Sequence, residues 1–406
     1  MMGSRPQLHR IKFVFAIIMA ITAMTIFGIA GSAEGAVRIG IVLPLSGQMG
    51  ALGEEVADAY RFAVDELRRK GDLGEDSLEL VFADTGGGPA QARATAERLI
   101  AEDRVSAIIG GIAGSATWEI ASVAQSRQIP LLITTASADS LTRQGWDYVF
   151  RLSLPAPAKL AAFAEFLDTA TRGIRTGAVL HDNSQLGPYR SEALLRLWHA
   201  RDIETLLISG FPAFSRDFRP LLARAKVKAP DLIYLIFSRE DAPMVLRQAK
   251  ELRLRAKMII GEAAGFGDPD LFHENPDMAD YFCVLAQWAP GAPYPGVYDF
   301  AEVYRELHGK MPDYRAAQAY AGMQVLIDAM RRARRPSPQN LRRALSKTTT
   351  ATVFGRVKFE THNGYTNQNH PTMLVLQRID QEQEIVWPRR LASKRLVFPN
   401  PDWRKK

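Results

Sequence analysis

The chain of 406 residues contains a single cysteine, Cys283, so it can form neither an internal disulfide nor a cysteine-based metal cluster. Cys283 lies in the apolar run DYFCVLAQW, where we expect it to be a small core residue. His362 and His370 bracket the turn-forming sequence NGYTNQN and do not have the spacing of metal ligands. The sequence therefore predicts no metal and no cofactor.

Motifs for catalysis and for nucleotide binding are also missing. No G-x-S-x-G occurs, so the nucleophile elbow of a hydrolase is absent. The loop GGIAGS, 110–115, lacks the lysine of a phosphate-binding Walker loop, and the first strand-to-helix turn, PLSGQMGALG, lacks G-x-G-x-x-G. His181-Asp182 follows an expected strand, where ordinary loop polarity explains the pair better than catalysis does. The sequence does not predict an enzyme.

Charge of one sign is only slightly in excess. The formal net charge is +7, and removal of residues 1–33 takes away three cations and no anion, which leaves +4. Arginines at 331, 332, 334 and 335 gather at one expected helix end, where cations complement the helix dipole. They are not interleaved with the aromatic residues that bind nucleic-acid bases, so we expect no nucleic-acid partner.

Long apolar runs are confined to the N-terminus. Phe13 to Ala30 is uncharged and apolar, follows the basic residues Arg5, Arg10 and Lys12, and precedes the small residues Gly31-Ser32-Ala33. This pattern predicts a signal peptide, 1–33, with cleavage after Ala36 as an alternative. An uncleaved anchor is the other interpretation, since eighteen apolar residues can just span a bilayer. No cysteine follows the run, which argues against a lipoprotein. We expect a periplasmic protein.

Strand-like and helical patterns alternate in two series, which indicates parallel sheets covered on both faces. Expected strands of the first series are 37–45, 77–84, 105–111 and 129–136, separated by helices at 53–70, 89–102 and 115–125. Expected strands of the second series are 148–154, 176–182, 205–211, 231–238 and 257–264. Helices at 297–308, 314–334 and 338–346 and strand-like runs at 353–360 and 372–379 follow. We expect these helices to return to the first lobe and the last strand to cross to the second.

Small polar residues recur where the expected strands end, which is where open α/β sheets bind ligands. They are Ser46 and Gly47, Gly114 and Ser115, Thr135, Ala136 and Ser137 in the first series, and Ser238 and Glu262 in the second. Each alone is as well explained by a helix cap or a turn. Their recurrence at the same end of successive strands favours a binding site.

Several segments carry a resemblance to a known family. They are IGIVLPLSGQMGALGEE (39–55), Asp84 followed by PAQARATAERLI (89–100), VSAIIGG (105–111), IPLLITTASADSLT (129–142), LRQAKEL (246–252), AYAGMQVLIDAM (319–330) and VFGRVKFE (353–360). In this order they resemble the periplasmic substrate-binding proteins of branched-chain amino-acid-type ABC transporters, the leucine-binding protein family. The resemblance covers nearly the whole mature chain.

The resemblance implies the type I periplasmic-binding fold, two similar doubly wound parallel-sheet lobes of α/β class joined by a multi-strand hinge. The implied division is 37–152 plus 285–362 for lobe 1, 153–284 plus 363–395 for lobe 2, and 396–406 for a C-terminal tail. A ligand would lie between the lobes. Ser137 matches a ligand-binding hydroxyl, Thr135 a carbonyl, and Glu262 the acid that holds an ammonium, while Gly114 stands where relatives carry a serine, with Ser115 next to it.

Other positions depart from the family pattern. Leu52 stands where relatives that bind leucine or valine have an aromatic wall, and Leu186 and the Ser238-Arg239 pair stand where tyrosines are common. A branched aliphatic side chain would therefore meet a different pocket. Arg239 could hold a second carboxylate or an aromatic acid if it points inward; a solvent-facing arginine is the alternative.

The function implied is that of a solute-binding receptor. The protein would capture an amino acid or related small carboxylate, close around it and deliver it to an ABC permease in the membrane, as a monomer and without chemistry on the ligand. A soluble periplasmic sensor that presents its closed form to a signalling partner is the alternative, and the fold serves both uses. An exported chain with no second membrane span and no attached signalling domain favours transport.

Overall fold

The computed structural model describes residues 36–73, 78–86, 88–183, 186–212, 215–273 and 280–401. The expected signal peptide, 1–33, lies outside the described residues. Within the described part, no helix is both long enough and apolar enough to cross a membrane.

The first sheet has the strand order β13-β14-β5-β4-β3-β1-β2. Neighbouring strands from β14 through β2 run parallel, and β13 is added antiparallel at the edge. Their bounds are β1 Val37–Leu43, β2 Leu78–Asp84, β3 Ala107–Gly110, β4 Leu131–Ile133, β5 Val149–Arg151, β13 Glu360–His362 and β14 Tyr365–Gln368. The carboxyl ends of β1 to β5 therefore meet at one edge.

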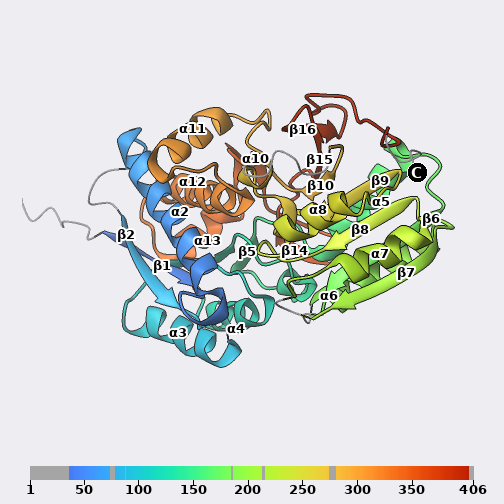
Figure 1. Ribbon diagram of the computed structural model, residues 1–406. Coiled ribbons are helices and arrows are strands. Elements are labelled where there is room, and N and C mark those ends of the chain that lie inside the picture. The colour runs from blue at the N-terminus through green and yellow to red at the C-terminus, as the bar shows by residue number, and fades with distance from the viewer. Residues whose placement is uncertain are drawn as a thin grey trace, which may run out of the picture.

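The second sheet has the order β16-β15-β10-β9-β8-β6-β7. Neighbouring strands from β10 through β7 run parallel, β15 pairs antiparallel with β10, and β16 pairs antiparallel with β15. Their bounds are β6 Thr176–Asp182, β7 Glu204–Phe211, β8 Leu232–Ile236, β9 Met258–Glu262, β10 Cys283–Ala286, β15 Leu374–Ile379 and β16 Glu382–Trp387. Two such sheets, each with flanking helices, make the α/β two-lobe arrangement expected from the sequence (Figure 1).

Helices cover both sheets, with α2, α3, α4, α11, α12 and α13 around the first and α5 to α8 around the second (Figure 1). Those around the first sheet are α2 Gly50–Arg69, α3 Pro89–Ala101, α4 Gly114–Ser126, α11 Val297–His308, α12 Tyr314–Ala333 and α13 Pro338–Leu345. Those of the second lobe are α5 Ala156–Ala170, α6 Leu186–His199, α7 Arg219–Lys228, α8 Ala242–Glu251, α9 Ala263–Phe266 and α10 Asp270–His273. The 3-10 turns η1 Gly47–Met49 and η2 Asp139–Thr142 lie in loops of the first lobe.

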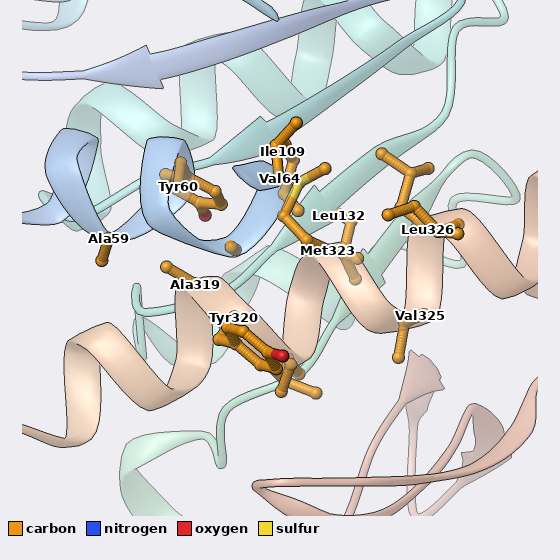
Figure 2. Packing of buried hydrophobic residues seen from close by; sticks show 14 of the residues in the cluster. Ala59, Tyr60, Val64, Ile109, Leu132, Ala319, Tyr320, Met323, Val325 and Leu326 are labelled. Carbon is orange, nitrogen blue, oxygen red and sulfur yellow. The ribbon is translucent and has the colours of Figure 1, made fainter. Parts of the chain in front are cut away.

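The core of the first lobe lies where α2 and α12 pack together over the sheet. Figure 2 shows Tyr60 and Val64 of α2 and Met323 of α12 in one apolar cluster with Ile109 of β3, and all four side chains are buried. At Gly322 a Cβ atom would lie 2.8 Å from Thr134 Cγ2 and 3.0 Å from Ile109 Cδ1, so only glycine allows α12 to approach this closely. The long C-terminal helices thus return to the first lobe, as the sequence predicts.

The chain crosses between the lobes after β5, after β10 and after β14, and hydrogen bonds join these crossovers. Gln287 accepts a bond from the Leu154 N–H at 2.9 Å, and the Asn369 amide donates to the Leu152 carbonyl at 3.0 Å. Three linked crossovers form the multi-strand hinge that was expected.

Sheet membership differs from the expected division of the chain in three places. β14, Tyr365–Gln368, belongs to the first sheet although the division places 363–395 in lobe 2, and β10 lies wholly in the second sheet although the division cuts it at 285. The expected strand 353–360 instead forms β12, Gly355–Lys358, in a hairpin with β11, Thr349–Thr352. The first part of the expected tail is packed, because Val397 exchanges two hydrogen bonds with the buried Gln377 of β15.

Candidate functional site

Two polar segments predicted from the sequence, the loop after β4 and the start of α4, lie in contact. The Ala136 N–H donates to the Gly111 carbonyl at 3.0 Å, and a Cβ atom at Gly114 would lie 2.9 Å from the Cβ of Ala138. The glycine therefore lets the loop 134–138 approach the first turn of α4. Backbone N–H groups in that turn have no intrahelical acceptor, so they can bind an anion. Ser115, next to Gly114, is exposed at the same helix start.

The three hydroxyls of this loop differ in their partners. Thr134 is bonded to the Tyr60 hydroxyl at 2.9 Å in the core. Thr135 Oγ1 is buried and has no hydrogen-bond partner among the described residues. Ser137 is half-buried, and its carbonyl accepts a bond from the Ala156 N–H at 3.0 Å. Ala136 is buried, and its carbonyl accepts a hydrogen bond from the Ser153 hydroxyl. Since alanine has no polar side-chain group, only the neighbours of Ala136 offer such groups to a ligand.

Two other predicted residues have structural roles. Ser46 is exposed and hydrogen-bonded to Asp84. Burial alone would raise the pKa of Asp84, but the bonds it accepts from the Ser46 side chain and from the Gly86 N–H outweigh burial and lower that pKa. Ser238 donates to Asp241 at 3.0 Å and accepts from the Asp241 N–H, which closes the turn before α8. Both serine side chains are therefore already hydrogen-bonded to a carboxylate of their own lobe.

Arg239 is partly exposed, and its guanidinium reaches across to the first lobe. Its guanidinium donates to Glu55 of α2 at 2.7 Å and pairs with Asp268 of the second lobe. Glu55 is also paired with Lys310. We call Glu55, Arg239, Asp268 and Lys310 the interlobe latch. Because two carboxylates already neutralise Arg239, the expectation that it could hold a second ligand carboxylate is not supported by this geometry.

Further contacts join the lobes beside this latch. The Met311 N–H donates to Asp270 of α10 at 2.9 Å, and Arg315 donates to the Ala264 carbonyl of α9 at 3.4 Å. Arg315 is buried in an ion pair with Asp313 at 2.7 Å, and Asp313 also caps the start of α12. Leu52 is half-buried one helical turn before Glu55, so it lies on the face of α2 that meets the second lobe.

Glu262 at the end of β9 is already engaged by a cation, Arg190, that was not predicted from the sequence. Its carboxylate is paired with Arg190 of α6 at 2.6 Å and accepts a bond from the Tyr234 hydroxyl of β8 at 3.3 Å. The charge of Glu262 raises the pKa of Arg190, and burial, then the same charge, raises the pKa of Tyr234 well above its ordinary value. The expectation that Glu262 is available to a ligand ammonium must therefore be revised. The side chain of Leu186, at the start of α6, lies outside the described residues.

A second cation, Lys159, lies near this pair. It is half-buried, one turn after the Ala156 amide that binds the loop of Thr135 and Ser137. Among the described residues it forms no ion pair and no side-chain hydrogen bond. Burial, followed by the charge of Arg190, lowers the pKa of Lys159 to about 8, although Glu262 acts in the opposite direction.

Tyr314 at the start of α12 completes this group from the first lobe. It is half-buried and lies close enough to Arg190 and Glu262 for their charges to act on its hydroxyl, and its own burial raises its pKa. We call Lys159, Arg190, Tyr234, Glu262 and Tyr314 the interlobe cluster. One feature of the sequence could have indicated it: Lys159 is the fourth residue of α5, where the helix dipole disfavours a cation.

A cavity of about 290 Å³ lies elsewhere, between α2 and α11. It is lined by Phe62, Leu307 and charged residues that pair with one another, such as Glu66 with Arg69 at 2.7 Å and Asp58 with Arg61 at 2.6 Å. None of the residues predicted as ligand-binding lines it, and each of its three acids is already paired with an arginine.

Comparison with known proteins identifies relatives along almost the whole chain. Residues 36–382 match the family model described as "Periplasmic binding protein". The "Leu/Ile/Val-binding protein homolog 8" of Brucella abortus (strain 2308) is 26% identical over 383 residues, which cover 89% of this chain and 93% of that protein.

Two solved structures share the fold. The branched-chain amino acid transporter substrate-binding protein of Streptococcus pneumoniae, in complex with isoleucine, has a TM-score of 0.73 at 20% identity, with coverage of 87% of this chain and 100% of that chain. The solute-binding protein of an ABC transporter from R. palustris, in complex with benzoate, has a TM-score of 0.72 at 18% identity and covers 87% of this chain and 96% of that chain. At these identities the similarity concerns the fold.

Proposed function

Because this chain belongs to the periplasmic binding protein family, we propose that it is the exported solute-binding receptor of an ABC importer and captures a small carboxylate between its two lobes. The lobes of this proposal are the two sheets with their helices, and residues 1–33 are the signal peptide that directs the chain to the periplasm. Delivery to a membrane permease completes the proposed role.

One observation carries the proposal. The buried Thr135 hydroxyl, without a partner among the described residues, lies in the loop that packs against the N-terminus of α4. A buried donor without an acceptor costs about 1–3 kcal/mol, and a bound carboxylate would supply that acceptor. The free N–H groups of the first turn of α4 would bind the same anion. Ser137 is the neighbouring hydroxyl, and Gly114 and Ser115 supply the helix start.

Cations from the second lobe support the same ligand class. Lys159 lies one turn from the amide that binds the Ser137 carbonyl, and Arg190 lies close enough to repel it electrostatically. A carboxylate held by the first lobe would attract both charges, so the ligand would bridge the lobes and favour the arrangement in which they meet. A ligand with micromolar affinity supplies about 8 kcal/mol, which is enough to bias a hinge.

Relatives with the same fold support a carboxylate ligand but differ in its kind. The protein from Streptococcus pneumoniae holds isoleucine and the one from R. palustris holds benzoate. Both ligands are small and carry one carboxylate. The proposal for this chain is therefore an amino acid or another small carboxylate.

Calorimetric titration of residues 34–406 with 4-methylpentanoate, benzoate, leucine and phenylalanine tests the proposal, with glucose as an uncharged control. We expect one site per chain for at least one carboxylate and no binding of glucose. Binding of glucose alone, or of none of the four carboxylates, would contradict carboxylate capture.

A further inference from the structure

We propose that Arg190, by holding Glu262, makes the interlobe cluster select organic carboxylates that lack an α-amino group over amino acids. The inference rests on the proposed capture of a small carboxylate and names the chemical class of that ligand. It reverses the role that family resemblance gives to Glu262.

The carboxylate of Glu262 is already occupied by partners in its own lobe. One carboxylate oxygen is 2.6 Å from Arg190 Nη1, and the other accepts the Tyr234 hydroxyl at 3.3 Å. The two side chains of the ion pair are 29% and 23% exposed, so the pair is partly shielded from bulk water. An incoming ammonium would have to displace a guanidinium that is fixed on α6 and already partly desolvated, and that arginine would then lose its counter-charge.

The charge balance of the interlobe cluster favours the same ligand class. Lys159 and Arg190 are cations and Glu262 is the anion of the cluster, while Asp313 and Arg315 beside it neutralise each other. Two further charges act on the cluster, Arg151 on Lys159 and Asp182 on Arg190, and they are opposite in sign. The cluster therefore carries one positive charge in excess, which matches one carboxylate. A zwitterionic amino acid would supply that carboxylate but would also bring a positive charge.

The carboxylates in the other contacts that join the lobes are also engaged. Glu55 and Asp268 hold Arg239, Glu55 also holds Lys310, and Asp313 holds Arg315. Asp270 accepts the Met311 N–H. An ammonium buried between the lobes would thus find no unpaired carboxylate among these residues, and an unpaired buried charge is costly.

The test uses ligand pairs that differ only in the amino group: leucine against 4-methylpentanoate, and phenylalanine against 3-phenylpropanoate. Calorimetry with wild-type protein should give at least tenfold tighter binding for the amine-free member of a pair. Tighter binding of the amino acid in each pair that binds would overturn the inference.

Variants locate the effect. Arg190→Met should free Glu262 and remove one cation, so the preference for the amine-free acid should fall at least tenfold or reverse. Arg196→Met, an exposed arginine on the same helix paired with Glu192, is the matched control and should leave the preference unchanged. An Arg190→Met protein that keeps the wild-type preference would contradict the proposal.

A second variant covers the case in which Arg190→Met does not fold. Glu262→Gln keeps the size of the side chain and frees Arg190, so affinity for the amine-free acids should stay equal or rise. A tenfold or greater loss of leucine or phenylalanine binding in this variant would show that Glu262 holds an ammonium and would overturn the inference. Failure of every acid to bind wild-type protein would instead overturn the proposed function, so the two failures are distinguishable.

Discussion

Adjacent threonines allow a direct separation of binding from stability. Thr135→Val removes the buried hydroxyl that has no partner, whereas Thr134→Val removes the hydroxyl bonded to Tyr60 at 2.9 Å. Valine matches threonine in shape, so neither change leaves a cavity. If Thr135 donates to the ligand carboxylate, its loss removes a hydrogen bond to a charged group, worth about 1.5–3 kcal/mol, or about 10- to 150-fold in affinity.

Stability should respond in the opposite way. Thr135→Val deletes an unsatisfied polar atom, so the free energy of unfolding without ligand should stay the same or rise by about 1 kcal/mol. Thr134→Val strands the Tyr60 hydroxyl in the core and should cost about 1–3 kcal/mol of stability with little change in affinity. Urea unfolding and calorimetry with 4-methylpentanoate measure both quantities. A Thr135→Val protein that loses stability but keeps its affinity would refute the assignment of this hydroxyl to the ligand.

Four further outcomes are expected. Affinity for a carboxylate should be constant between about pH 6 and 7 and fall above about pH 8, as Lys159 loses its proton amid Arg190, Glu262, Arg151 and Arg315. Lys159→Arg should flatten this profile, and an unchanged wild-type affinity at pH 10 would exclude Lys159 from the site. Because the pKa of Lys159 is lower in the folded than in the unfolded chain, the unliganded wild-type protein should gain stability from pH 8 to 10. Glu55→Gln should weaken binding two- to fivefold by loosening the interlobe latch, an effect of about 0.5–1 kcal/mol that salt should reduce. The control Glu54→Gln, in which the replaced carboxylate lies 3.8 Å from Arg61 on the same helix, should leave affinity unchanged. Equal effects of the two variants would show that the latch does not bias closure. N-terminal sequencing of the exported protein should begin near Glu34 or Val37, and an intact Met1 on a membrane-bound product would contradict export and release.

The parallel lobes were predictable because strand and helix periodicity is a local property. The runs 176–182 and 205–211 correspond to β6 and β7 almost residue for residue. The edge strand β16 was missed, since Glu382, Gln383 and Glu384 place polar residues where an apolar alternation would be sought. β14 was assigned to the wrong sheet because YTNQ carries no apolar pattern, and its place is fixed by its pairing with β5.

The candidate site was predictable only where it follows strand ends. Gly114, Thr135 and Ser137 come together because the carboxyl ends of neighbouring parallel strands meet at one edge. Arg190 lies 72 residues from Glu262 in the chain and had the context of a solvent-facing helix residue, so no local signal could pair them. The same holds for Arg239 and Glu55, which are 184 residues apart and on different lobes.

Small-angle scattering on the protein with and without a bound carboxylate tests the central claim most directly. The claim is that one small acid is captured between the lobes and holds them together. The protein is saturated with 4-methylpentanoate, or with whichever of the four acids calorimetry shows to bind. We predict a smaller radius of gyration for the saturated protein than for the free protein. At the same ligand concentration, Thr135→Val should show a smaller change in this radius. A saturated protein with the same radius as the free protein would contradict the account.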